Sequence, residues 1–206
     1  MSNDLTLESS LPNQERILQE RASQIIRVAD EVSDDEFGKF YSDEYGNFAH
    51  AIGRDVYLLL SALQLQPGQK LIDLGSGDGR WVFIAAILGL KGEGYELNPK
   101  VHRVAQHVQE ILRNERILTE DELTRVSLYN DDLLKADLSQ TAAVVYWDGS
   151  GAGSDNVERK ILSEAKEGTK VVIYGYLGGY KKLKPTEINL PLTRNHAKVF
   201  EVPAKQ

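Results

Sequence analysis

The sequence of 206 residues contains no cysteine. This absence excludes disulfides, thiolate nucleophiles and thiolate metal sites together, and it is consistent with a reducing compartment. Histidine is scarce as well, with four residues scattered along the chain. His102 and His107 are five positions apart, not the four that would place two ligands on one face of a helix. We therefore expect no metal site.

Long hydrophobic runs are also missing, since no stretch approaches the ~18 apolar residues that suggest a membrane span. Residues 1–11 are polar and acidic, and we expect them to be disordered. They lack the basic start and apolar middle of a secretory signal and the arginine bias of a transit peptide. The expectation is a soluble, cytoplasmic protein without a membrane partner.

Positive charge is under-represented. Lysine and arginine together number 24 against 31 aspartates and glutamates, which gives a formal net charge of −7. An acidic chain repels phosphate backbones, so a nucleic-acid partner is disfavoured. The apolar fraction of 41% is ordinary for a globular protein, and the length fits one domain with a small appendage.

Helical spacing of apolar residues predicts helices over 13–31 and 49–65, and the acidic, aromatic segment between them, 33–48, is predicted to be a loop or a pair of short turns. From Lys70 the pattern changes, and short apolar strands alternate with helices. The predicted order is strand 70–74, helix 80–90, strand 92–97, helix 100–114, strand 125–130, strand 142–148, helix 155–165 and strand 168–176.

This alternation is typical of an α/β domain with a mostly parallel sheet and helices on both faces. Residues 186–192 and 197–202 are joined by a turn-like segment and could form an antiparallel hairpin at the sheet edge. The chain is therefore divided into an N-terminal helical and loop extension, 1–48, and an α/β domain, 49–206.

The stretch "DLGSGDGR", residues 73–80, follows the first strand of this domain. Gly75, Gly77 and Gly79 let the chain turn tightly and let a ligand approach the backbone. In open α/β sheets ligands bind at the carboxyl ends of the strands, so this loop is the first candidate site. The alternative is an ordinary strand-to-helix turn.

Glycine spacing separates two cofactor classes. Dinucleotide sites carry glycines at relative positions 1, 3 and 6, whereas here they fall at 1, 3 and 5. Asp73 stands two residues before the first glycine. A pyrophosphate avoids a nearby carboxylate, whereas a ligand with an ammonium or sulfonium group is attracted to it. S-adenosylmethionine has both cations and no phosphate.

Together with "GYELNP" (94–99) and "NDDLLKADLS" (130–139), the glycine stretch resembles class I methyltransferases, the seven-strand Rossmann-like family, and in particular their protein lysine methyltransferases. The resemblance covers roughly residues 45–175. It implies a seven-strand sheet and S-adenosylmethionine as cofactor, with Glu96 binding the ribose hydroxyls and Asp132 and Leu133 at the adenine. The cofactor-binding residues it implies are Tyr45, Phe48, Asp73, Gly75, Ser76, Gly77, Glu96, Leu97, Asn98, Asp131, Asp132, Leu133 and Trp147.

The loop after the fourth strand, "VVYWDGSG" (144–151), is where substrate meets the methyl group in this family. The lysine-modifying relatives provide no counterpart for Trp147 to Gly151, and the Asn/Asp-Pro-Pro-aromatic motif of DNA base methyltransferases is missing. Tyr146, Trp147 and Asp148 are the catalytic candidates: the rings as walls of an amine site, and Asp148 as a hydrogen-bond acceptor or base. Strand alternation sends Tyr146 and Trp147 to opposite faces, so one of them is expected in the core. Asp148 could equally make a turn.

These features predict a methyltransferase that N-methylates a protein lysine or another amine, including a small-molecule amine. Two alternatives stay open: a non-enzymatic binding module with this fold, and a nicotinamide-dependent oxidoreductase, which the glycine spacing and Asp73 disfavour. Neither the acceptor nor the oligomeric state follows from the sequence.

Overall fold

The computed structural model describes residues 13–38, 40–44, 46–49, 53–149, 154–175, 179–186, 188 and 197–204. At its centre is a seven-stranded sheet with the strand order β5-β4-β3-β6-β7-β9-β8. The strands of this sheet are β3 (Lys70–Leu74), β4 (Lys91–Tyr95), β5 (Val126–Tyr129), β6 (Ala143–Asp148), β7 (Lys170–Gly175), β8 (Lys184–Pro185) and β9 (Ala197–Glu201).

Neighbouring strands from β5 to β7 are parallel, and β9 runs antiparallel between β7 and β8. The order reverses between β3 and β6, because the chain goes outward from β3 to β5 and then returns to the other side of β3. Ligands bind at such a switch point in open α/β sheets. The predicted mostly parallel sheet with a C-terminal antiparallel pair is confirmed. Strand β8, which pairs with β9, lies just before residues 186–192, the segment that was predicted to form this strand.

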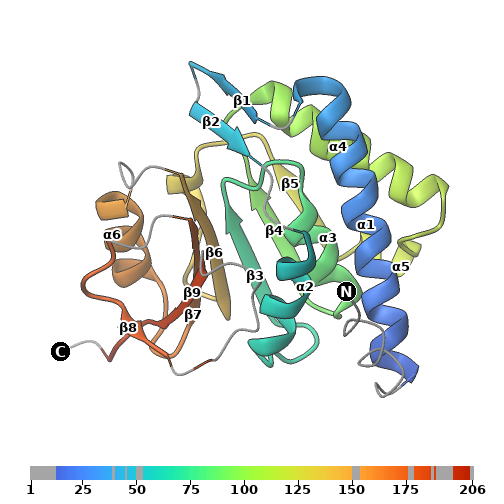
Figure 1. Cartoon of the computed structure of the whole chain (residues 1–206). Helices are drawn as coiled ribbons and strands as arrows, with labels where there is room; N and C mark the ends of the chain where they lie inside the picture. Colours follow the sequence, from blue (N-terminus) through green and yellow to red (C-terminus); the bar gives the residue numbers. More distant parts are fainter. Residues whose placement is uncertain are drawn as a thin grey trace, which may run out of the picture.

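Helices cover both faces of the sheet (Figure 1). Those on one face are α1 (Asn13–Phe37), α2 (Gly53–Ala62), α3 (Arg80–Ile87), α4 (Pro99–Asn114) and α5 (Glu120–Leu123), and α6 (Ser154–Glu164) lies on the other. Alternate strand residues supply the two cores. In β3, Leu71 belongs to the cluster under α1 to α5, and Ile72 belongs to the cluster under α6. The period-2 alternation of the strands thus assigns each side chain to one face.

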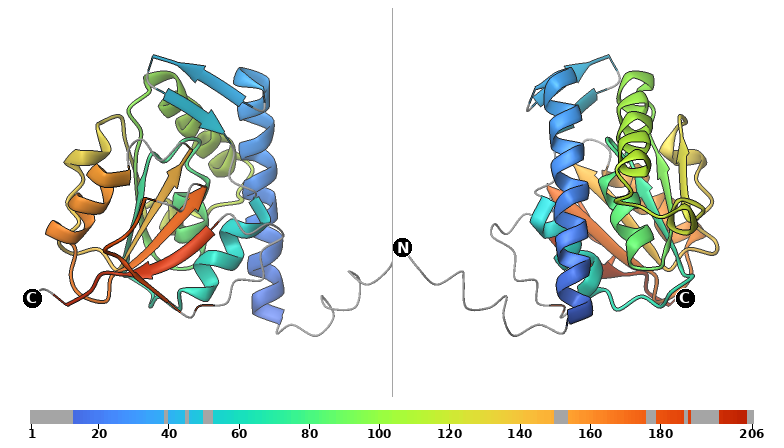
Figure 2. Two further views of the ribbon diagram at one scale, coloured as in Figure 1. Left: turned by 60° about the vertical axis from the view of Figure 1, so that its left-hand side comes forward. Right: turned by 90° about the vertical axis from the view of Figure 1, so that its right-hand side faces the viewer.

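The N-terminal region differs from the prediction, because the segment 33–48 is not a loop. Helix α1 continues to Phe37, and Ser33, Val32 and Phe37 extend its buried stripe while the intervening acids face solvent. Gly38, with a φ of 70°, ends it. The chain then forms an antiparallel hairpin, β1 (Phe40–Asp43) and β2 (Gly46–Ala49), which stands at the carboxyl end of the large sheet (Figures 1 and 2).

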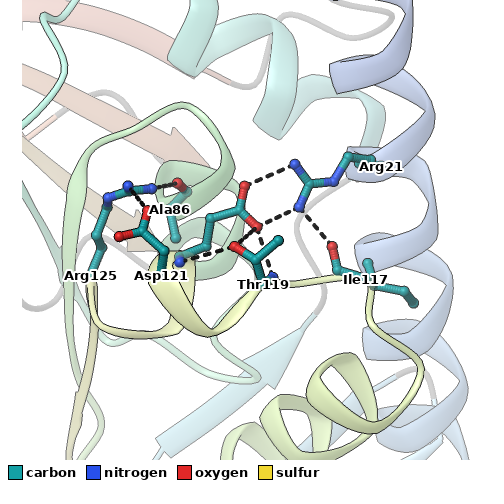
Figure 3. A network of polar contacts seen from close by, with 7 residues as sticks. Arg21, Ala86, Ile117, Thr119, Asp121 and Arg125 are labelled. Carbon is teal, nitrogen blue, oxygen red and sulfur yellow. Dashed lines mark hydrogen bonds and ion pairs between the residues drawn. The ribbon is translucent and has the colours of Figure 1, made fainter.

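Helix α1 is fastened to the core by the partly buried ion pair of Arg21 and Glu122 (Figure 3). Arg21 donates to both carboxylate oxygens, at 2.8 and 2.5 Å, and to the carbonyl of Ile117 at 2.8 Å. Glu122 also completes the capping box of α5 with Thr119. Burial alone would raise the pKa of Glu122, but the hydrogen bonds from Arg21 and Thr119 lower it below its ordinary value. The buried apolar residues of α1 also belong to the same hydrophobic cluster as those of α2 and α3.

The lowered pKa of Glu122 predicts a pH-dependent contribution to stability. A carboxyl group whose pKa is lower in the folded state stabilises the protein above its ordinary value of 4.5, and the contribution is lost as the pH falls through the folded-state value. Glu122→Gln should reduce the free energy of unfolding by about 1–3 kcal/mol at pH 7. The difference from wild type should shrink below pH ~4.5.

Urea unfolding at several pH values measures this difference. Arg16→Ala, which removes the exposed Arg16–Glu20 pair on the same helix, is the control and should change stability by less than about 0.5 kcal/mol. A difference between wild type and Glu122→Gln that stays constant from pH 7 to pH 3 would contradict the assignment.

Candidate active site

The loop after β3 has three residues in a backbone conformation that favours glycine. Gly75, Gly77 and Gly79 have φ angles of 88°, 55° and 81°, in the left-handed region that costs other residues about 1–2 kcal/mol. A Cβ on Gly79 would also lie 2.8 Å from the ring of Phe83. Gly75 is exposed, whereas Gly77 and Gly79 are buried, so close packing as well as backbone conformation requires a glycine at Gly79.

The same loop is hydrogen-bonded to the neighbouring strand, β4. The N–H groups of Gly75 and Ser76 both donate to the carbonyl of Tyr95, at 2.8 and 2.9 Å. This approach depends on Gly94, where a Cβ would lie 2.7 Å from the side chain of Ser76. Gly94 thus has a packing role that the sequence pattern did not indicate.

Glu96 joins the loops that follow β3 and β4. One carboxylate oxygen accepts from the N–H of Gly77 at 3.0 Å, and the other accepts from the N–H of Asn98 at 2.8 Å. Burial raises the pKa of Glu96, and these two N–H groups partly offset the effect. Each carboxylate oxygen can accept a further hydrogen bond, so Glu96 could still bind two hydroxyl groups.

Asp73, the last residue but one of β3, is 2% exposed, and its Oδ2 has no hydrogen-bond partner in the part of the chain that the structure describes. Burial raises its pKa well above the ordinary value, and the nearby carboxylates of Asp78 and Glu96 raise it further. A buried carboxylate oxygen without a donor is costly. A cationic ligand would supply the missing partner.

A buried ionic network, which sequence analysis missed, holds the loop to α1. Arg80 is 2% exposed and bonds to Asp78 at 2.5 Å and to Asp30 at 2.8 Å. Ser33 donates to Asp78 at 3.2 Å. Burial alone would lower the pKa of Arg80, but the two carboxylates raise it. The partners lie about 50 residues apart in the chain, so no local pattern could reveal them.

The residues after β4 have distinct positions. Asn98 is buried and caps α4, accepting from the N–H of Lys100 at 2.9 Å, and its amide donates to Asp43 of the hairpin at 2.9 Å. Leu97 is exposed. Phe48 lies in β2, whose side chains the structure does not describe, and Tyr45 lies outside the described residues. The hairpin therefore stands beside the predicted ribose site through Asp43.

The loop after β5 forms the next part of the site. Asp131 accepts from the N–H of Asp132 at 2.8 Å and from Lys135 at 2.6 Å, and the Lys135 hydrogen bond lowers its pKa. Asp132 caps the short 3-10 helix η2 (Leu133–Lys135), and Leu133 is partly buried. Asn130, which was not predicted, donates to the carbonyls that follow β4, at 2.8 and 3.1 Å. It holds the two loops together.

At the end of β6, Tyr146 and Trp147 point to opposite faces, as predicted. Tyr146 packs in the cluster under α6, where burial raises its pKa to about 12. Trp147 is half-buried on the other face, and Cβ atoms on Gly149 and Gly175 would lie 2.6 and 3.3 Å from its ring. Asp148, the last residue of β6, is buried.

Asp148 accepts a hydrogen bond of 2.8 Å from Tyr180, whose pKa is raised by burial and by this bond.

The register of β3, β4 and β6 places the other candidates on one face. Asp73 pairs with Gly94 and with Val145, so Glu96 and Trp147 each lie two residues farther along on the same side. A carboxylate for a cation, a second for hydroxyl groups and an aromatic wall thus follow one another across the sheet.

Several known proteins are similar to this chain. No family model matches the sequence. A rat lysine N-methyltransferase named for a subunit of ATP synthase is 32% identical over 125 residues, which cover 61% of this chain and 53% of the relative. The mouse adenine nucleotide translocase lysine N-methyltransferase is 51% identical over 53 residues, which cover 25% of this chain and 23% of the relative. The chain thus spans about half the length of the first relative and a quarter of the second.

The crystal structure of an RNA methyltransferase from Salinibacter ruber, in complex with S-adenosyl-L-homocysteine, has a similar fold. Its TM-score is 0.58 at 22% identity, over 73% of this chain and 92% of that protein. In the described residues no helix is long and apolar enough to span a membrane. The strand order and the glycine loop after its first strand give the chain the class I, seven-strand methyltransferase fold, with a sequence similar to the protein lysine N-methyltransferases.

Proposed function

We propose that the chain is an S-adenosylmethionine-dependent methyltransferase that N-methylates a protein lysine. The observation that carries the proposal is the buried, unpartnered Oδ2 of Asp73, beside a backbone loop built from glycines with positive φ. This site fits a compact ligand with a cationic end. It does not fit a pyrophosphate, because the carboxylates of Asp73 and Glu96 lie beside the loop and would repel it.

The residues that would hold the cofactor follow the sheet from β3 to β5. Asp73 would bind the ammonium group, and the backbone of Gly75 to Gly77 would lie against the amino-acid moiety. Glu96 would bind the ribose hydroxyls beside exposed Leu97, and Asp131 to Leu133 would line the adenine. Asn98 positions Glu96 and the hairpin. When bound, S-adenosylmethionine supplies an activated methyl group on a sulfonium.

The chain's own task is to exclude water and to present the acceptor in line with the methyl group. Trp147, held by Gly149 and Gly175 on the face of Asp73, is the wall against which an amine would lie. An aromatic face attracts both the sulfonium and an alkylammonium, each by ~0.5–2 kcal/mol. The relatives are named for lysines of an ATP synthase subunit and of adenine nucleotide translocase, and these names support a protein lysine as acceptor.

Three other functions are less well supported. A small-molecule amine would also be a cation that a negatively charged site attracts. Only identification of the methylated product therefore distinguishes a small-molecule acceptor from a protein. RNA is disfavoured by the net charge of −7, although a structurally similar protein is an RNA methyltransferase. A binding module without activity would retain the cofactor and transfer no methyl group. A cytoplasmic location, supported by the lack of cysteine, belongs to the same proposal.

The test of the proposal is transfer of a labelled methyl group to proteins of a host lysate, followed by mass spectrometry of the modified residues. Methyl-lysine in a discrete protein is the expected result. Cofactor binding without any transfer would support the binding module, and no binding of S-adenosylhomocysteine below millimolar concentrations would overturn the proposal.

Asp73→Asn should separate cofactor binding from stability. Loss of the charged hydrogen bond should weaken S-adenosylhomocysteine binding by about 1–3 kcal/mol. The raised pKa means that ionised Asp73 destabilises the empty protein at pH 7, so its free energy of unfolding should not fall. Wild-type affinity should rise with pH as Asp73 ionises, and that of Asp73→Asn should not.

Calorimetric titration at several pH values, together with urea unfolding, measures both quantities. Equal affinity in the two proteins, or loss of affinity accompanied by a marked loss of stability, would mean that Asp73 has a structural role instead.

Gly94→Ala should disturb the site through the loop it supports. The added Cβ, 2.7 Å from Ser76, would displace the glycine loop from β4 and weaken S-adenosylhomocysteine binding at least tenfold. Gly68→Ala is the matched control, because Gly68 has a positive φ of 83° but lies outside the site, with nothing within 4 Å of the added atom. It should lose stability, by about 1 kcal/mol, and retain affinity. Equal binding by both variants would exclude the proposed contact.

A further inference from the structure

Two buried side-chain oxygens lack a hydrogen-bond partner in the described part of the chain: Oδ2 of Asp73 and Oδ1 of Asp55. The first has a place in the proposed function, and the second does not. Asp55 lies in the first turn of α2 and is 0% exposed. Its other oxygen accepts from Tyr174 at 3.4 Å, which is long beside the ~2.7–2.8 Å usual for a hydroxyl donor.

The second buried carboxylate–phenol pair, Asp148 and Tyr180, provides an internal comparison. It lies on the opposite face of the sheet and has a hydrogen bond of 2.8 Å. The fold can therefore satisfy a buried carboxylate with a tyrosine at normal length. At Asp55 one oxygen has a distant donor and the other has none, so this carboxylate has the capacity for a strong donor that the described residues do not supply.

The position of Asp55 connects it to the reaction site. Tyr174 is the last residue but one of β7, and it pairs with Trp147 in the register of β6 and β7. Both side chains lie on the face that carries Asp73. Along the carboxyl edge of that face, Asp73 lies at β3, Trp147 at β6, and Asp55 over Tyr174 at β7. The two unsatisfied carboxylates thus belong to the same face of the sheet as Trp147.

We propose that Asp55 binds the ammonium group of the methyl acceptor. This inference rests on the proposed function, in which Asp73 receives the cation of the cofactor and Trp147 is the wall against which the acceptor amine lies. A lysine side chain has an ordinary pKa of about 10.4 and arrives as a cation. Asp55 gives it a buried counter-charge, and the half-buried Trp147 gives its alkyl chain an aromatic surface. The acceptor class is therefore a primary alkylammonium on an unbranched chain.

The test uses n-butylammonium as a probe of the lysine side chain and n-butanol as its neutral counterpart. Both tryptophans report on the site, since Trp81 meets the ring of Tyr174 edge-on at 6.5 Å and Trp147 pairs with Tyr174 in the sheet. In protein saturated with S-adenosylhomocysteine, n-butylammonium should change the tryptophan fluorescence saturably, and n-butanol should bind about ten- to hundredfold more weakly.

Asp55→Asn, which keeps the shape and removes the charge, should abolish the preference for the ammonium while calorimetry shows unchanged S-adenosylhomocysteine affinity. Tyr174→Phe keeps the carboxylate and should retain the preference. Glu158→Gln, which removes a buried carboxylate of α6 on the opposite face of the sheet, is the matched control and should keep the wild-type preference for the ammonium.

Equal binding of the two probes by the wild type would overturn the inference, and this comparison needs no variant to fold. A preference that survives in Asp55→Asn, or that is lost in Tyr174→Phe, would overturn it as well. If S-adenosylhomocysteine itself fails to bind the wild type, the proposed function fails and this inference with it. If it binds and only the ammonium preference is missing, the proposed function stands.

Discussion

The site depends on the contact between the glycine loop and the next strand of the sheet. Gly94 lets Ser76 approach β4, and the carboxylate of Glu96 then accepts from Gly77 on one side and from Asn98 on the other. These hydrogen bonds join the loops after β3 and β4, which are about 20 residues apart in the sequence. N–H donation to the carbonyl of Tyr95 and to the carboxylate of Glu96 holds the backbone of the loop in place. A ligand therefore meets a preformed surface, which reduces the entropy lost on binding.

Residues with a local signature were predictable from the sequence. Asp73, the three glycines and Glu96 follow apolar strands, and alternation along β6 placed Tyr146 and Trp147 on opposite faces. What sequence did not reveal depends on partners that are distant in the chain. Arg80 resembles an ordinary helix-start residue until Asp30 is seen beside it. The prediction of a loop over residues 33–48 was wrong for two reasons. The acidic residues at the end of α1 outnumber its buried residues there, so no helical pattern of apolar residues is evident. The sequence between β1 and β2 also has no strong turn signal.

The N-terminal region is physically joined to the site at two points. Ser33 and Asp30 of α1 bond to Asp78 and Arg80 in the glycine stretch, and Asp43 of the hairpin bonds to Asn98 beside Glu96. The distant end of α1 is fastened separately by Arg21 and Glu122. A displacement of α1 would therefore move groups that lie next to Asp73 and Glu96. The N-terminal extension thus contacts the loops of the proposed cofactor site across the predicted boundary at residue 48.

Two buried acids differ from the other buried acids in the hydrogen-bond donors that the described residues supply. Asp78 has Arg80, Glu122 has Arg21, and Glu158 accepts from two backbone N–H groups after Tyr180. Each of these buried acids stabilises the fold because the fold supplies its donors. Asp55 and Asp73 are equally buried, and each has an oxygen for which the described residues supply no donor. An apolar residue at either position would cost less. Asp55 and Asp73 lie on one face of the sheet, beside Trp147. This arrangement is explained if the missing donors are two cations, one on the cofactor and one on the acceptor. Both carboxylates are then satisfied only when the two reactants are bound together.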